Sequence, residues 1–143
     1  MEIALIAAET KKELMVQFCI AYCGVLAKHN ICATKMTGKM VSEATGLDIE
    51  QLLPGNQGGI QQIASRVAYN EIDVLLYFRD GSDNPEEIMT DADLMRECDR
   101  SNVPTATNIA TAEAIITALD RGDLDWREFW NPKSEYNRSK RMR

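Results

Sequence analysis

The stretch LPGNQGGIQQ, residues 53–62, follows a short apolar run and leads into a helical pattern of apolar residues. Its three glycines, Gly55, Gly58 and Gly59, let the backbone turn with positive φ and approach a ligand closely. Free N–H groups at the start of the following helix favour an anion. Glycine clusters also occur in many ordinary strand-to-helix turns. The stretch therefore indicates a strand–turn–helix unit and leaves open whether the turn binds a ligand.

Apolar runs and helical patterns alternate on both sides of this stretch. Residues 3–7 form a continuous apolar run of the kind buried on both faces of a sheet, and further strands are expected at residues 31–34, 49–53, 72–78 and 103–107. Helical spacing between these runs predicts an α/β fold. We expect a single doubly wound domain, with a parallel five-stranded sheet and helices on both faces. Ligands bind such sheets outside the carboxyl ends of the strands, near a switch in strand order.

Local signals refine three of the connections. Thr10 can cap the first helix, and Glu13 completes a capping-box pattern. Residues 35–38 are expected to form a strand-to-helix loop. Residues 79–91 are polar and contain glycine and proline, which predicts a long loop. Long loops in compact domains are often functional.

The length of 143 residues predicts one domain, which we place at residues 1–130. Residues 131–143 form a locally basic C-terminal tail, for which a solvated or frayed segment is favoured over a binding arm. The net charge of −6 argues against general nucleic-acid binding through phosphates.

The number and spacing of the cysteine and histidine residues limit the kinds of metal or disulfide site that we expect. The four cysteines make no CxxC pair and are expected to be small buried hydrophobes in a reducing cytoplasm. The chain has one histidine, His29, so we expect no metal site and no cofactor. No signal peptide and no apolar run of membrane-spanning length is found, so no membrane partner is expected.

Residues 54–80, PGNQGGIQQIASRVAYNEIDVLLYFRD, resemble the centre of the methylglyoxal synthase family, where SGPxGGDQQ is followed by a helix, a strand and FFxDP. The likeness extends from residues 3–14, IALIAAETKKEL, to residues 103–116, VPTATNIATAEAII. The resemblance implies the fold of that family and a homo-oligomer, a hexamer. It also implies conversion of dihydroxyacetone phosphate into methylglyoxal and inorganic phosphate. In that reaction a carboxylate removes a carbon-bound proton, an enediolate forms and phosphate leaves.

Several positions depart from the family pattern. The acidic residue of GGDQQ is the family's base, and its position here is Ile60, so no catalytic residue is assigned. In the family's AHDxKK loop, Ala8 replaces the histidine and Glu9 the aspartate. In the loop after residue 78, Glu87 replaces a second histidine and Thr90 replaces the closing aspartate.

The candidate ligand-binding residues follow from the positions that match. Lys12 matches a phosphate-contacting lysine, and Asp80 matches the leading aspartate of the fourth loop. Lys35 replaces a glycine, so it is strained if that position has positive φ. Asn108 faces the pocket or caps the next helix. The full set is Lys12, Thr34, Lys35, Thr37, Gly38, Gly55, Gly58, Gly59, Asp80 and Asn108.

The main prediction is a protein that has lost the synthase reaction and is not an enzyme. It would bind a small phosphorylated metabolite or nucleotide in the family pocket, for sensing or sequestration. The alternative is an active synthase that uses a relocated carboxylate, such as Glu9, Glu87 or Asp91. A third possibility is a structural subunit that assembles with a true synthase.

Overall fold

The computed structural model describes residues 1–141 and has the predicted α/β architecture. One five-stranded, all-parallel sheet has the order β3-β2-β1-β4-β5. The strands are β1 (Glu2–Ala7), β2 (Asn30–Ala33), β3 (Ile49–Gln51), β4 (Val74–Phe78) and β5 (Thr105–Ala106). In the register, Ala4 of central β1 pairs with Cys32 on one side and with Leu75 on the other. The prediction of a doubly wound parallel sheet is confirmed.

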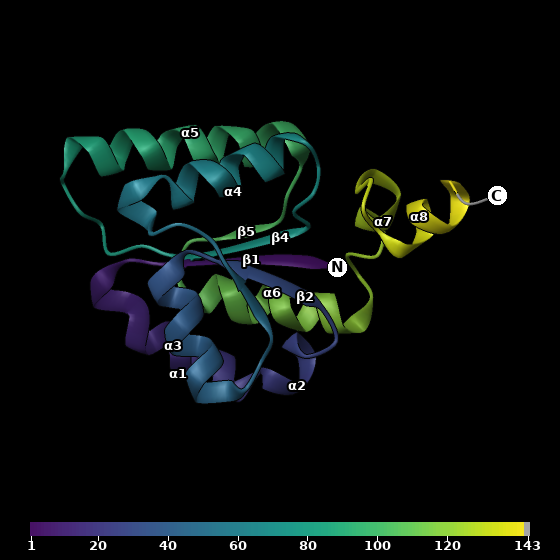
Figure 1. Cartoon of the computed structure of the whole chain (residues 1–143), viewed down its shortest axis with the longest axis horizontal. Helices are drawn as coiled ribbons and strands as arrows, with labels where there is room; N and C mark the ends of the chain where they lie inside the picture. The colour runs from purple at the N-terminus through teal and green to yellow at the C-terminus, as the bar shows by residue number, and fades with distance from the viewer. Residues whose placement is uncertain (142–143) are drawn as a thin grey trace.

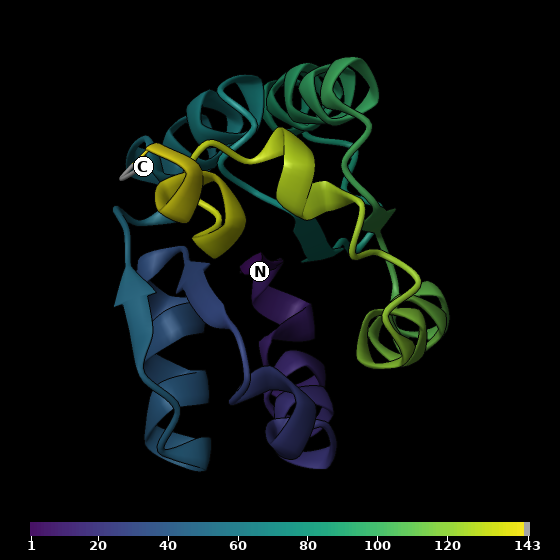
Figure 2. The ribbon, with the colours of Figure 1, turned by 90° about the vertical axis from the view of Figure 1, so that its right-hand side faces the viewer.

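Helices cover both faces of the sheet (Figures 1 and 2). On one face lie α4 (Gly59–Ala68) and α5 (Pro85–Ser101). On the other lie α1 (Lys12–Ala21), α2 (Cys23–Leu26), α3 (Lys35–Thr45) and α6 (Ile109–Arg121). Because strand side chains alternate between faces, Leu76 joins the core under α1 and α6 and Leu75 joins the core under α4 and α5.

The start of α1 differs from the prediction. A single 3-10 turn, η1 (Glu9–Lys11), precedes the helix, and no side chain caps either element. The predicted capping box with Thr10 and Glu13 is therefore wrong. Thr10 instead donates its hydroxyl hydrogen to Asp80 Oδ2 at 3.1 Å. That bond ties the loop after β1 to the loop after β4.

Two predicted loops are largely helical. Residues 35–38 form the first turn of α3, and Lys35 is not among the non-glycine residues with positive φ, so the conditional strain does not arise. Helix α5 begins at Pro85, because Asn84 accepts hydrogen bonds from the N–H groups of Glu86 and Glu87. Proline suits the first helical position, where its missing N–H is no loss. Only residues 79–84 remain a loop.

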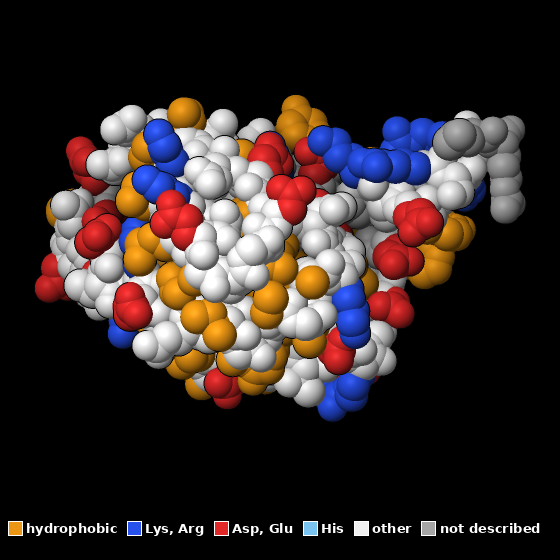
Figure 3. All heavy atoms as spheres, turned by 60° about the horizontal axis from the view of Figure 1, so that its bottom comes forward, with side chains coloured by type: hydrophobic (Ala, Val, Ile, Leu, Met, Phe, Trp, Pro, Cys, Tyr) orange, Lys and Arg blue, Asp and Glu red, His pale blue; other side chains and the backbone are white. Residues whose placement is uncertain are grey.

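The C-terminal segment packs at the amino end of the sheet. It contains α7 (Arg127–Trp130) and α8 (Glu135–Arg141), which lie near the N-terminus in Figure 1. Helix α8 has no buried residue, and basic side chains gather on this projection in Figure 3. The tail is thus solvated but helical rather than frayed over residues 135–141. The domain boundary at residue 130 stays a prediction.

Aspartate 73 anchors this segment. The carboxylate of Asp73 accepts hydrogen bonds from Glu2 N at 2.8 Å, Arg127 Nε at 3.3 Å and Asn131 Nδ2 at 3.0 Å. Asp73, Arg127 and Asn131 are all buried. Within residues 1–141, no helix combines the length and the apolar character needed to cross a bilayer.

Candidate functional site

A cavity of about 1140 Å³ opens at the carboxyl ends of the strands. Its floor is formed by the ends of β1 and β4, where Ile6 and Tyr77 face each other in register. Strand order reverses between these two strands, since the chain goes from β1 outward to β2 and β3 and then returns to β4. The cavity therefore lies at the switch point where doubly wound sheets bind ligands.

One wall of the cavity carries a lysine and a hydroxyl. Lys12, the first residue of α1, donates from Nζ to Ala7 O at 2.9 Å and lies 3.3 Å from a carboxylate oxygen of Glu9. A lysine ammonium has three hydrogens, so a further donor is available. Thr34 lies at the N-cap of α3 and lines the cavity, with its hydroxyl 3.4 Å from that of buried Thr37. This wall can contact an anion.

The glycine-rich stretch forms the rim beside that wall. Residues 55–57 make a 3-10 turn, η2 (Gly55–Gln57), and Gly58 follows with a φ of 102°. A Cβ added at Gly59 would lie 2.0 Å from Leu53 O, so the close approach of the two backbones requires glycine. A Cβ added at Gly55 would make ordinary contacts with Ile60 and Thr34, and Gly55 lines the cavity.

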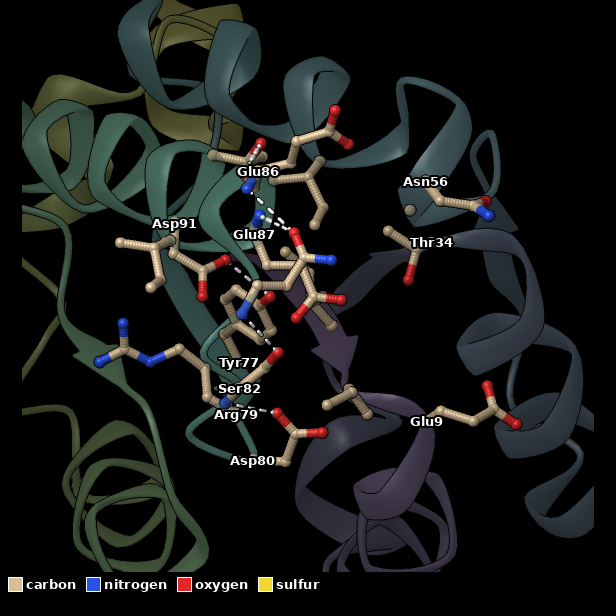
Figure 4. Close-up of a pocket in the computed structure, with 18 of the residues that line it drawn as sticks. Glu9, Thr34, Asn56, Tyr77, Arg79, Asp80, Ser82, Glu86, Glu87 and Asp91 are labelled. Atoms are coloured by element: carbon tan, nitrogen blue, oxygen red, sulfur yellow. Dashed lines mark hydrogen bonds between the residues drawn. The ribbon is translucent and has the colours of Figure 1, made fainter.

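The opposite wall is acidic (Figure 4). Four carboxylates belong to this wall, Asp80, Glu86, Glu87 and Asp91, and a fifth, Glu9, lines the cavity beside Lys12. Asp91 is partly buried, whereas the other four are exposed. Asp80 accepts from Ser82 N at 3.0 Å as well as from Thr10, so its carboxylate organises the loop after β4.

Asp91 is hydrogen bonded by a tyrosine at the end of β4. The hydroxyl of Tyr77 donates to Asp91 Oδ1 at 2.7 Å. Burial raises the pKa of the Asp91 carboxyl, and the Tyr77 hydrogen bond and Arg79 partly offset that rise. Burial, with Asp91 nearby, also raises the pKa of Tyr77, which keeps this hydroxyl protonated. Sequence analysis did not single out Tyr77, because it fits the apolar pattern of a strand.

The structure brings together part of the predicted site. Lys12, Thr34, Gly55 and Asp80 line the cavity, together with Ile60. Asn108 does not line it and instead accepts a hydrogen bond from Thr111 N, as a helix cap. The remaining predicted residues that lie outside the cavity lining are Lys35, Thr37, Gly38, Gly58 and Gly59. The ligand-binding roles of all these residues stay predictions.

The one histidine of the chain does not line the cavity. His29 lies at the amino end of the sheet, where its Nδ1 is 3.0 Å from the N-terminal nitrogen of Met1. In the described part of the chain, no three residues among histidine, cysteine, aspartate and glutamate are grouped to hold a metal ion. The ionisable residues of the described cavity lining are five carboxylates, Lys12, Tyr77 and Arg79.

Comparisons with known proteins point to one family. A family model for the MGS-like domain matches residues 15–107. The methylglyoxal synthase of Caldicellulosiruptor saccharolyticus is 56% identical over 140 residues, covering 97% of this chain and 99% of the relative. That of Thermoanaerobacter sp. is 48% identical over 131 residues, covering 90% and 97%. The crystal structure of methylglyoxal synthase from Elizabethkingia anophelis NUHP1 aligns with a TM-score of 0.71 and 34% identity, covering 80% of this chain and 76% of that one.

These relatives contradict the main functional prediction. Similarity over nearly the whole chain to proteins named methylglyoxal synthase supports the alternative of an active synthase better than a binding protein. The predictions of lost catalysis, of a pseudoenzyme and of a chain that is not an enzyme are therefore wrong. They rested on the substitutions at Ile60, Ala8, Glu87 and Thr90, and gave less weight to the alternative of a relocated carboxylate, of which the cavity holds several.

Proposed function

Because the chain belongs to the methylglyoxal synthase family, we propose that it converts dihydroxyacetone phosphate into methylglyoxal and inorganic phosphate. One observation carries this proposal. A single cavity at the sheet's switch point is lined by Lys12, Thr34 and five carboxylates, and Thr34 lies across from Glu86, Glu87 and Asp91 in Figure 4. The reaction needs both: an anion site for the phosphate, and a carboxylate to remove a carbon-bound proton.

The phosphate would bind at the wall formed by Lys12, Thr34 and Gly55. Helices α1, α3 and α4 all start at this edge of the sheet, and their N-termini carry partial positive charge. Lys12 adds a full charge with limited exposure, since 15% of its side chain is accessible. A charge-assisted hydrogen bond to phosphate oxygen is stronger than a neutral one. This wall thus offers the most favourable anion position in the cavity.

The proton would be removed by a carboxylate other than residue 60. Isoleucine has no ionisable group, so Ile60 contributes only an apolar surface to the cavity. Arg79 also lines the cavity, and its guanidinium can stabilise negative charge on the developing enediolate. Carboxylates, cations and hydroxyls of this chain thus supply each role the reaction requires.

Assembly and location extend the same proposal. We expect a homo-oligomer, a hexamer by resemblance to the family, located in the cytoplasm. Exposed apolar side chains such as Ile20 and Trp130 support burial against other copies, and Figure 3 shows apolar side chains spread over one face. The four free cysteines fit a reducing compartment. Light scattering of the purified protein tests the number of copies.

The test is a direct assay of purified protein with dihydroxyacetone phosphate. Methylglyoxal and inorganic phosphate should appear in a one-to-one ratio at a rate of roughly 1 s⁻¹ or more. Lys12→Ala should lower kcat/KM by about 10- to 100-fold, the loss of a charge-assisted hydrogen bond. Lys39→Ala is the matched control, because Lys39 is exposed on α3 and does not line the cavity. Absence of methylglyoxal, or equal activity in Lys12→Ala and wild type, would refute the proposal.

A further inference from the structure

We propose that Asp91 is the general base of this reaction and that Tyr77 is the residue that positions it. The inference rests on the proposed function and selects one carboxylate out of the five that line the cavity. It is supported by the position of Asp91 in the fold, by its hydrogen bond to Tyr77, and by the contacts and exposure of the other four carboxylates.

Asp91 sits on a rigid element. It is in the second turn of α5, a helix fixed at its start by the Asn84 cap and further along by fully buried Leu94. Its partner Tyr77 is only 7% exposed and belongs to strand β4, next to the central strand β1. A 2.7 Å hydrogen bond joins Tyr77 Oη to Asp91 Oδ1. A base supported by a helix and a buried strand residue is held in one orientation, as proton transfer requires.

The second oxygen of Asp91 is the one that can accept the proton. The Tyr77 hydrogen bond goes to Oδ1, and Asp91 is among the residues that line the open space of the cavity. Thr34 and Asn56 lie on the other side of that space. A substrate whose phosphate contacts Thr34 and Lys12 would extend its carbon chain toward the Asp91 wall.

The other carboxylates are less suited to the role. Glu9 is paired with Lys12, and its side chain is 89% exposed. Asp80 is hydrogen bonded through both oxygens, to Ser82 N and to Thr10. Glu86 and Glu87 are exposed on the first turn of α5. An exposed carboxylate is stabilised in its charged form by water and is therefore a weak base.

In the proposed reaction Asp91 holds the transferred proton only until phosphate leaves. Asp91 takes a proton from the hydroxymethyl carbon of dihydroxyacetone phosphate, and the carbon–hydrogen electron pair becomes the C=C bond of an enediolate. The hydroxyl proton moves to the former carbonyl oxygen, and the carbon–oxygen bond to phosphate breaks with its electron pair leaving on phosphate. Phosphate takes the proton from Asp91, which restores the carboxylate. The remaining enol rearranges to methylglyoxal.

The charged groups around Asp91 set the pH range of activity. Tyr77 comes from β4, Arg79 and Asp80 from the loop that follows, and Glu87 from one turn earlier on α5. Glu9 and Lys12 line the cavity from the first loop, and α4 contributes uncharged Ile60 and Gln61. Burial is the largest influence and raises the pKa of Asp91. A base with a raised pKa is matched to work nearer neutral pH.

The first test replaces the base. Asp91→Asn keeps the size of the side chain and should lower kcat by about 10²- to 10⁴-fold, with KM little changed and the melting temperature preserved. It should equally slow the exchange of substrate carbon-bound hydrogen with deuterium oxide, followed by NMR. Asp93→Asn is the matched control, because Asp93 is exposed on the same helix and pairs with Arg96. If Asp91→Asn retains more than about a tenth of kcat, the assignment is overturned.

The second test uses the pH profile and does not depend on the first variant folding. The Tyr77 hydroxyl stabilises the charged carboxylate, so Tyr77→Phe should move the acidic limb of kcat/KM to higher pH. Tyr69→Phe, on an exposed tyrosine at the end of α4, should leave the limb in place. An unmoved limb in Tyr77→Phe would overturn the positioning role. If wild type releases methylglyoxal and Asp91→Asn does too, only this inference fails; if wild type releases none, the proposed function fails.

Discussion

Asp73 and Asp91 are both partly or fully removed from water, at opposite ends of the same sheet. Asp73 is 2% exposed, and its two oxygens accept three hydrogen bonds from Glu2, Arg127 and Asn131. Asp91 borders a cavity and is hydrogen bonded by Tyr77 at one oxygen. A carboxylate saturated by fixed donors holds structure, whereas one with an oxygen facing a cavity can exchange a proton. One type of side chain thus stabilises the fold at the amino end of the sheet, as Asp73, and borders the cavity at the carboxyl end, as Asp91.

Asp73→Ala should have the largest effect on stability. The variant leaves Arg127 buried at 1% exposure without its carboxylate partner. Breaking a buried pair in this way typically costs about 3–5 kcal/mol in the free energy of unfolding. Urea unfolding measures the loss, and methylglyoxal release per folded molecule should be unchanged.

Asp120→Ala is the control for that experiment. Asp120 forms an exposed pair with Lys28 at 3.1 Å, and exposed pairs contribute about 0–1 kcal/mol. If Asp73→Ala cost no more than Asp120→Ala, or lowered kcat in the folded fraction, the division between the two ends of the sheet would not hold.

Asn131→Ala tests how the C-terminal segment is attached. The variant removes the amide that donates to Asp73 Oδ2 at 3.0 Å and leaves the bonds from Glu2 and Arg127 in place. The expected loss is about 1–3 kcal/mol, the usual cost of leaving a buried acceptor short of a donor. Urea unfolding would detect this loss. Asn56→Ala and Asn108→Ala are not suitable as control variants, because Asn56 lines the cavity and Asn108 caps a helix.

Asn137→Ala provides the comparison for Asn131. Its amide donates to the backbone oxygens of Glu128, Phe129 and Asn131, and two of those bonds are exposed. A smaller loss is expected there. Equal losses of stability in Asn131→Ala and Asn137→Ala would indicate that Asp73 is not the main anchor of the C-terminal segment. They would favour a weak junction at the domain boundary predicted at residue 130.

The sheet could be predicted from the sequence because strands buried in a parallel sheet consist mainly of apolar residues. Residues 72–78 are apolar except for Asp73, and the strand that this run predicts is β4 (Val74–Phe78), which is buried at every position. Helix α5 was partly missed for the opposite reason. Its first turns are exposed and polar, so they resemble a loop, although Asn84 followed by Pro85 is a helix-start signal that was available.

The site was only partly predictable, because it depends on contacts between distant positions. Matching loops placed Lys12, Thr34 and Gly55 at the cavity. Tyr77 and Asp91 are 14 positions apart, and their hydrogen bond arises only when α5 packs back over β4. Motif comparison considers one position at a time, so the substitutions at Ile60, Ala8 and Glu87 suggested lost chemistry and outweighed the possible relocated carboxylates Glu9, Glu87 and Asp91.

Thr34→Val should have a moderate effect confined to the cavity end. Valine keeps the shape but removes the hydroxyl that faces the proposed phosphate position. Loss of a neutral hydrogen bond of about 0.5–1.5 kcal/mol corresponds to a rise in KM of roughly 2- to 12-fold. Steady-state kinetics measure it, with Thr117→Val as control, since Thr117 is exposed on α6 and bonds only to Glu113 O. An unchanged KM would move the phosphate away from Thr34.

The smallest effect is expected at His29, which lies at the structural end near Met1. Burial, followed by the N-terminal ammonium and Lys28, lowers the pKa of His29 below its usual value of 6.5. The folded state therefore holds fewer protons on His29 than the unfolded chain between the lowered pKa and 6.5. Stability from the neutral ring is fully present above pH 6.5 and is lost as the pH falls through that window.

His29→Gln should remove this pH dependence, because glutamine does not titrate. The raised pKa values of Glu2 and Asp91 act with the opposite sign, favouring the folded state as the pH falls, and both proteins retain them. The quantity to compare is therefore the change in unfolding free energy between pH 8 and pH 5 in wild type and in His29→Gln. Wild type should lose more stability than His29→Gln over this range. The pH profile of methylglyoxal release should be the same in both proteins, since His29 lies at the end of the sheet opposite the cavity; a shifted profile would show that the two ends are coupled.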